Sequence, residues 1–216
     1  RLVIRRHRDR VLVAVDANTG KYIWYFQVTH HDIWDMDTQS APMLVDVKKD
    51  GKTIPAVITV NKNALMFILD RTNGKPIFGA EERPVPQSEV PGEKTSPTQP
   101  FPVKPEQLSM GSVSHDTLYK GVAEHQAFCE KYVADNQFKL ASTYTPPGYE
   151  HWTVAPPGTQ GGVNYYGGSF DPVRHLLSVT PRHTVVLLAG DTLRFVGLAA
   201  KLARAMQPAV VVLEDC

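Results

Sequence analysis

Two histidines, three aspartates and a tryptophan lie within eight positions of the chain, in the segment HHDIWDMD at residues 30–37. A carboxylate held beside a substrate hydroxyl can act as a general base and accept the hydroxyl proton. Carboxylate oxygens are also ligands that calcium prefers in proteins. The alternative interpretation is a solvated turn, in which these side chains only bond to nearby backbone groups. Both interpretations are open on the residues of this segment alone.

The composition is that of an ordinary globular protein, with 216 residues, 42% hydrophobic and 21% charged residues. A net charge of +1 gives no reason to expect nucleic acid or an acidic membrane surface as a partner. Cys129 and Cys216 are too far apart in sequence to indicate a disulfide framework or a zinc site. The arginine-rich run RLVIRRHRDR at residues 1–10 is interpreted as a frayed, solvated terminus.

Short apolar runs rich in β-branched and aromatic residues predict a mainly β protein. The predicted strands cover residues 11–15, 22–28, 43–47, 54–60 and 64–69. The proline-rich segment 83–107 cannot be a central strand or a helix, so it is either a disordered linker or a long ordered excursion. A helix is predicted over residues 116–133, with Leu118, Val122, Phe128 and Val133 on its apolar side.

An internal repeat supports a particular β architecture. The segment AVDANTGKYIW at 14–24 matches ILDRTNGKPIF at 68–78, and SFDPVRHLLSV at 169–179 is a weaker third copy. A strand-turn-strand unit repeated at this spacing is typical of β-propeller blades. In this pattern Asp16 and Asp70 are expected to accept hydrogen bonds within their turns, and Trp24 and Phe78 are expected in the core.

The C-terminal segment differs in kind from the rest. After Thr180 the pattern reads strand, turn, amphipathic helix, strand, so a boundary is predicted near residues 180–184. The predicted fold is therefore a partial β-propeller of about three blades, followed by a short α/β C-terminal unit. The predicted divisions are an unassigned basic terminus (1–10), the propeller (11–180) and a strand-helix-strand tail of different origin (181–216).

The segment 30–37 and the repeats on each side of it resemble the quinoprotein dehydrogenases, eight-bladed propellers that bind pyrroloquinoline quinone (PQQ) and calcium. The resemblance is greatest to the membrane-bound glucose dehydrogenase group and covers residues 11 to about 178. It is carried by DANTGKYIWYFQVTHHDIWDMDTQSAPMLVDV, VNKNALMFILDRTNGKPIF, EERPVPQSEVPGEKTSPTQPFP and GGVNYYGGSFDP.

The resemblance implies roles for three residues. The aspartate directly after the tryptophan, here Asp35, is the family's proposed catalytic base and could also touch the calcium ion. The lysine 27 positions later, here Lys62, is expected to donate to the quinone oxygens of PQQ. Asn164 matches a cofactor-contacting asparagine, although Tyr165 replaces the tryptophan that often follows it in the family. His30, His31, Asp32 and Asp37 are given no chemical role.

By this resemblance the parent protein oxidises a sugar or polyol hydroxyl, passes electrons to ubiquinone or another acceptor, and works in the periplasm, with any membrane association through parts outside this sequence. Three of eight blades predict that the chain alone is an inactive fragment. One alternative is a non-catalytic partial propeller that binds a partner. Another rests on VVVLEDC, where Glu214 and Asp215 resemble the Walker B segment of AAA-type ATPases, although no phosphate-binding loop accompanies it. The abrupt change of pattern at residues 181–216 indicates that this tail is either a true fusion or an assembly artefact.

Overall fold

The computed structural model describes residues 2–7, 10–118, 121–165, 167–174, 176–179 and 186–188. The predicted boundary at 180–184, the tail helix and the Glu214–Asp215 pair all lie outside these residues. Nothing in the described part is a helix long and apolar enough to cross a membrane.

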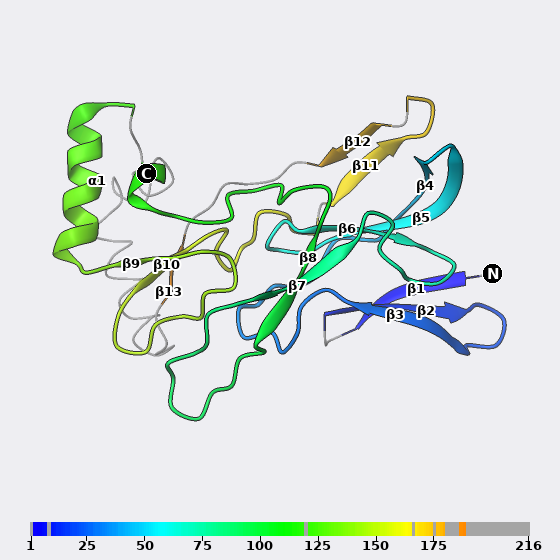
Figure 1. Ribbon diagram of the computed structural model, residues 1–216, viewed down its shortest axis with the longest axis horizontal. Helices are drawn as coiled ribbons and strands as arrows, with labels where there is room; N and C mark the ends of the chain where they lie inside the picture. The colour runs from blue at the N-terminus through cyan, green and yellow to red at the C-terminus, as the bar shows by residue number, and fades with distance from the viewer. Residues whose placement is uncertain are drawn as a thin grey trace.

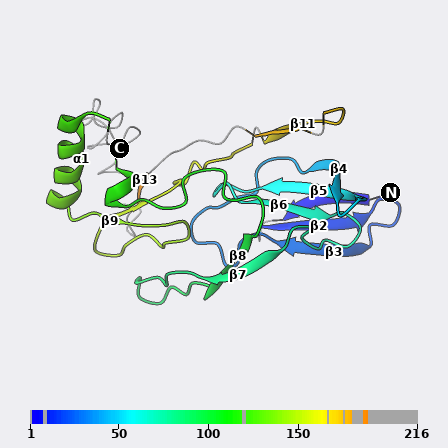
Figure 2. The same cartoon turned by 45° about the horizontal axis from the view of Figure 1, so that its top comes forward.

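Two three-stranded antiparallel sheets lie side by side in both ribbon views (Figures 1 and 2). The first sheet contains β1 (Leu2–His7), β2 (Val11–Asp16) and β3 (Tyr22–Gln27). The second contains β4 (Met43–Lys49), β5 (Lys52–Val60) and β6 (Met66–Asp70). All five predicted strands are therefore present, within one to three residues at most ends.

The smaller elements extend from these two sheets. The strands β7 (Ala80–Pro84) and β8 (Thr98–Pro102) form a separate antiparallel ribbon, and the hairpin of β11 (Gly168–Asp171) and β12 (Leu176–Val179) lies beside β4. At the far end in Figure 1 lie α1 (Ala123–Asp135) and a sheet of β9 (Lys139–Leu140), β10 (Thr153–Ala155) and β13 (Val186–Leu188). One 3₁₀ turn, η1, spans His115–Thr117.

Three sequence interpretations change against the structure. The basic terminus is not frayed: residues 2–7 form β1, which pairs antiparallel with the whole of β2 because the edge of β2 offers matching backbone donors and acceptors. The proline-rich segment is an ordered excursion, since its two arms pair as β7 and β8. The helix begins at Ala123 rather than at 116, and Phe128 stacks on Tyr132 at the surface instead of facing the core.

The repeat seen in the sequence is also a repeat in three dimensions. In the first two copies the aspartate N–H donates to the carbonyl of the lysine five positions later, and the glycine N–H donates back to the aspartate carbonyl at 2.8 Å. The Asp16 carboxylate accepts hydrogen bonds from the Thr19 hydroxyl and backbone N–H, which lower its pKa. Asp70 accepts from Thr72 and Asn73, and Asp171 accepts two backbone N–H groups in the third copy. The predicted turn acceptors are confirmed.

Trp24 joins the first sheet to the second. Its side chain is 5% exposed, and its Nε1 donates to the carbonyl of Arg71 at 3.0 Å, in the turn of the second copy. The indole lies so close to Gly74 that a Cβ there would stand 2.6 Å from Trp24 Cε3. Gly74 also has a φ of +75°, which favours glycine. The repeat glycine thus gives both the turn and the room for the neighbouring sheet to dock.

We expect Gly74→Ala to destabilise the chain far more than Gly20→Ala. Both glycines have φ near +70°, so each substitution costs about 1 kcal/mol of backbone strain. A Cβ at Gly20 meets nothing within 4 Å, whereas at Gly74 it overlaps Trp24 and adds about 1–3 kcal/mol of overpacking. Urea unfolding of the two variants measures the difference. Equal losses of stability would mean that the two sheets do not dock through Trp24.

Candidate active site

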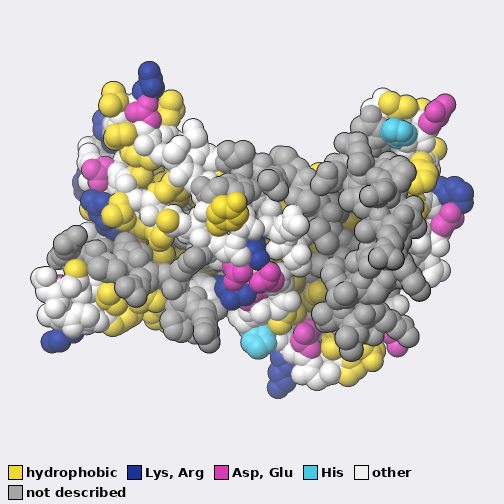
Figure 3. All heavy atoms as spheres, turned by 180° about the vertical axis from the view of Figure 1, so that it is seen from behind, with side chains coloured by type: hydrophobic (Ala, Val, Ile, Leu, Met, Phe, Trp, Pro, Cys, Tyr) yellow, Lys and Arg dark blue, Asp and Glu magenta, His cyan; other side chains and the backbone are white. Residues whose placement is uncertain are grey.

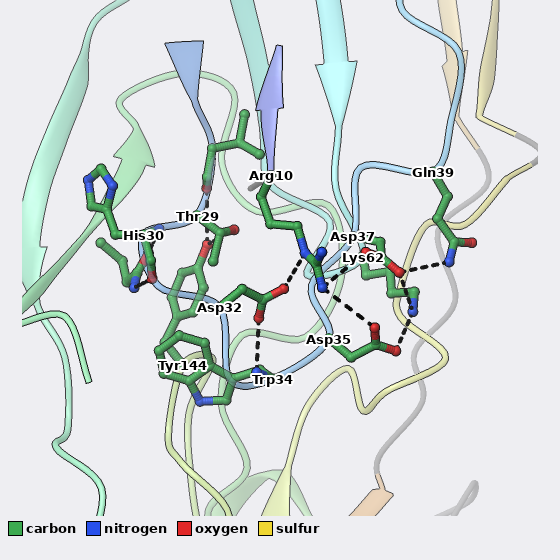
Figure 4. A network of polar contacts seen from close by, with 12 residues as sticks. Arg10, Thr29, His30, Asp32, Trp34, Asp35, Asp37, Gln39, Lys62 and Tyr144 are labelled. Carbon is green, nitrogen blue, oxygen red and sulfur yellow. Dashed lines mark hydrogen bonds and ion pairs between the residues drawn. The ribbon is translucent and has the colours of Figure 1, made fainter. Parts of the chain in front are cut away.

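The segment 30–37 forms the connection between the first and second sheets, and it carries the polar network drawn in Figure 4. Asp35 lies at its turning point with a φ of +63°, a left-handed conformation that aspartate adopts more readily than most residues. Lys62 comes from the loop directly after β5, where its N–H donates to the carbonyl of Asp37 at 2.9 Å. Lys62 is therefore joined to this segment through its backbone at Asp37 and through its side chain at Asp35.

The ammonium of Lys62 bridges two carboxylates. Lys62 Nζ lies 2.7 Å from Asp35 Oδ2 and 3.2 Å from Asp37 Oδ2. The lysine side chain is 6% exposed, whereas the Asp35 side chain is 56% exposed. The cation is thus held inside the protein while the carboxylate beside it stays open to an incoming molecule. Near the middle of the face drawn in Figure 3, acidic and basic side chains lie in direct contact.

The surroundings of Asp37 favour its ionised form. Burial raises the pKa of Asp37, but hydrogen bonds from Gln39 and Lys62 and the charge of Arg10 outweigh it, so the pKa lies below its ordinary value. Arg10 itself binds Asp32 through Nε and lies 3.1 Å from Asp37 through Nη2. Asp32 also accepts the backbone N–H of Trp34 at 2.9 Å, as expected for a residue that shapes its own loop.

A buried framework holds the loop from behind. Trp34 is 3% exposed and packs edge-to-face on Tyr144 at 5.2 Å between ring centroids. Burial raises the pKa of Tyr144 to about 12, and its hydroxyl lies 3.3 Å from that of Thr29. The buried Gln99 of β8 accepts the N–H of His30 and donates to its carbonyl, both at 2.7 Å. The proline-rich excursion therefore clamps the start of the candidate site.

Asn164 lies in a loop that backs onto Lys62. The N–H of Gly162 donates to the Lys62 carbonyl at 2.7 Å, and a Cβ on Gly161 would come within 2.7 Å of the Lys62 Cβ. The bonds of the Asn164 side chain itself stay within the loop: Nδ2 donates to the carbonyl of Gln160, and Oδ1 accepts the N–H of Tyr165. The structure brings Asp35 and Lys62 together and sets the Asn164 loop behind them.

Sequence reasoning missed two residues of this site. Arg10 lies in the basic run that was predicted to be frayed. Gln99 lies in the proline-rich segment, for which no site residue was predicted. The sequence signal for Gln99 is that TQPF lies in a segment that carries the resemblance. The structure adds that this amide is fully buried, and a buried amide needs hydrogen-bond partners. No local pattern identified Arg10, because its three carboxylate partners lie 22 to 27 positions along the chain.

Comparison with known proteins identifies the family. The family described as "PQQ: Glucose/ethanol/alcohol dehydrogenase, beta-propeller domain" matches residues 6–192. The chain belongs to this PQQ dehydrogenase family. The predicted resemblance is confirmed, and with it the mainly β, partial-propeller fold; among the residues that the structure describes, the sheets do not close into a ring.

Individual members of the PQQ dehydrogenase family support the same assignment. The quinoprotein glucose dehydrogenase of Gluconobacter oxydans (strain 621H) is 38% identical over 174 residues, 79% of this chain and 21% of that protein. The glycerol dehydrogenase large subunit of Gluconobacter thailandicus is 35% identical over 80% of this chain and 24% of that protein. The crystal structure of quinohemoprotein alcohol dehydrogenase from Comamonas testosteroni superposes with a TM-score of 0.50 and 25% identity, covering 84% of this chain and 21% of that one. The chain thus spans less than a quarter of the length of these relatives.

Proposed function

We propose that this chain is part of a PQQ-dependent dehydrogenase that oxidises a sugar or polyol hydroxyl and delivers the electrons to ubiquinone or another acceptor in the periplasm. The observation that carries the proposal is the half-exposed Asp35 carboxylate held 2.7 Å from the buried Lys62 ammonium, in a chain of this family. The substrate class follows relatives named for glucose, glycerol and quinate.

Asp35 is proposed as the general base. Oxidation of an alcohol to a carbonyl removes a hydride from carbon and a proton from the hydroxyl, and the proton needs an acceptor. A carboxylate that is 56% exposed can be approached by the hydroxyl and take that proton. The salt bridge to Lys62 and the buried Trp34 behind the loop keep the carboxylate in one place, which lowers the entropic cost of reaching a reactive arrangement.

Lys62 is proposed as a donor to the quinone oxygens of the cofactor. PQQ, when bound, supplies a quinone that accepts the hydride. The residues present suit such an anionic group: Lys62 uses two of its three N–H donors on Asp35 and Asp37, so one remains for an oxygen of the cofactor. The Asn164 loop, which lies against the Lys62 backbone, is proposed to add a further contact to the cofactor.

The described residues fit calcium less completely than they fit PQQ. Within the part of the chain that the structure describes, no three His, Cys, Asp or Glu side chains gather as a metal site. Asp35 is proposed as a calcium ligand, although two cations already flank it. The remaining oxygen ligands are proposed to come from backbone carbonyls, amide side chains or other parts of a longer polypeptide.

The test is a chimera, termed here the dehydrogenase chimera, in which residues 6–178 replace the matching segment of the Gluconobacter oxydans quinoprotein glucose dehydrogenase. We expect dye reduction with glucose that requires both added PQQ and added calcium. The chain by itself should show no turnover, since it spans less than a quarter of such proteins. A folded chimera that binds no PQQ would overturn the proposal and favour a partial propeller that only binds a partner.

A further inference from the structure

Arg10 stands opposite Lys62, across the same two carboxylates. Arg10 Nη2 lies 3.7 Å from Asp35 Oδ1 and 3.1 Å from Asp37 Oδ1, while Lys62 Nζ takes the Oδ2 atom of each aspartate. Each carboxylate is therefore held by two cations, one at each oxygen. Figure 4 shows the guanidinium and the ammonium on two sides of this pair.

Arg10 reaches one carboxylate more than Lys62 does. Its Nε binds Asp32, so a single guanidinium joins all three aspartates of the loop that carries the proposed base. Three carboxylates and two cations lie within this network, so removing Arg10 would leave three like charges around one ammonium. A guanidinium also has donors at fixed angles, which lets it set the directions of several carboxylates together, whereas an ammonium acts as a point charge.

We propose that Arg10 is a positioning residue: it fixes the orientation of the Asp35 carboxylate and holds Asp37 and Asp32 beside it. This inference rests on the proposed function for its catalytic meaning. Because Arg10 pairs with the Oδ1 atom of Asp35 and of Asp37, the Lys62 ammonium is left to bridge their Oδ2 atoms with one donor left over. Arg10 touches neither substrate nor cofactor in this scheme and acts only through Asp35.

The first test uses the chain as it is, without cofactor. Carboxyl ¹³C NMR spectra of Arg10→Gln should show shifted Asp35 and Asp37 signals, because each carboxylate loses the cation at its Oδ1 atom. Arg71→Gln is the matched control, since Arg71 is similarly exposed and pairs at 3.5 Å with Asp46 outside the site. If Arg10→Gln does not fold, Arg10→Lys takes its place. Unchanged Asp35 and Asp37 signals in a folded variant would overturn the inference.

The second test separates positioning from charge. In the dehydrogenase chimera, Arg10→Gln should lower kcat by about ten- to a hundredfold with little change in KM, because the base is misplaced and the binding site is not. Arg10→Lys keeps the positive charge but lacks the fixed donor directions of the guanidinium, so it should recover only part of the lost kcat. Full restoration by lysine would contradict positioning. A chimera inactive even with Arg10 would count against the proposed function, and the NMR result would still decide the role of Arg10.

Discussion

Replacing Asp35 with asparagine in the dehydrogenase chimera is expected to lower turnover by about 10²- to 10⁴-fold, the usual contribution of a general base. Asparagine has nearly the same shape and can still accept a hydrogen bond from Lys62, so the loop should keep its conformation. It cannot take up the hydroxyl proton. Steady-state dye reduction measures the loss, and the absorbance of bound PQQ should be unchanged.

Asp46→Asn is the matched control for this variant. Asp46 is exposed to the same degree as Asp35, 57% against 56%, and it also pairs with a cation, Arg71. It lies on β4, outside the network of the site. The control should retain full turnover. An Asp35→Asn enzyme that turned over at the parent rate would remove Asp35 from the role of base.

Lys62→Met is expected to reduce both stability and cofactor binding. Methionine fills the space of the buried lysine stem but leaves Asp35 and Asp37 side by side with only Arg10 between them. Because these carboxylates are partly exposed, solvent screens them, and the loss should be about 1–3 kcal/mol rather than the larger value of a fully buried pair. Urea unfolding of the chain gives this value, and PQQ titration of the chimera gives the second effect.

The control for Lys62 is Lys49→Met. Lys49 is also partly buried and donates a short hydrogen bond, 2.6 Å, to the carbonyl of Ile77. It should lose stability without any change in PQQ affinity, since it contacts no residue of the site. Should both lysine variants bind PQQ as tightly as the parent, Lys62 would have no role as a cofactor donor.

Local interactions explain why so much of the fold was predictable. The turns at Asp16 and Asp70 are built from contacts within five residues, so residue type and spacing alone predicted them. The alternation of short apolar runs placed the strands because each run must bury one face. The prediction for Phe128 was wrong, since its ring stacks on Tyr132 of the same helix at the surface and does not pack in the core.

The sequence by itself determined the repeated blades and the residues that could do chemistry, Asp35 and Lys62, because these follow from local patterns and from a family motif. The tertiary structure alone decided their setting. Burial of Lys62, exposure of Asp35 and the clamp by Gln99 depend on chain segments 27 to 69 positions apart. The pairing of β2 with β3, continued by the hydrogen bond from the Val28 N–H to the Arg10 carbonyl, brings Arg10 into the network, and such long-range ion pairs leave no periodic trace in sequence.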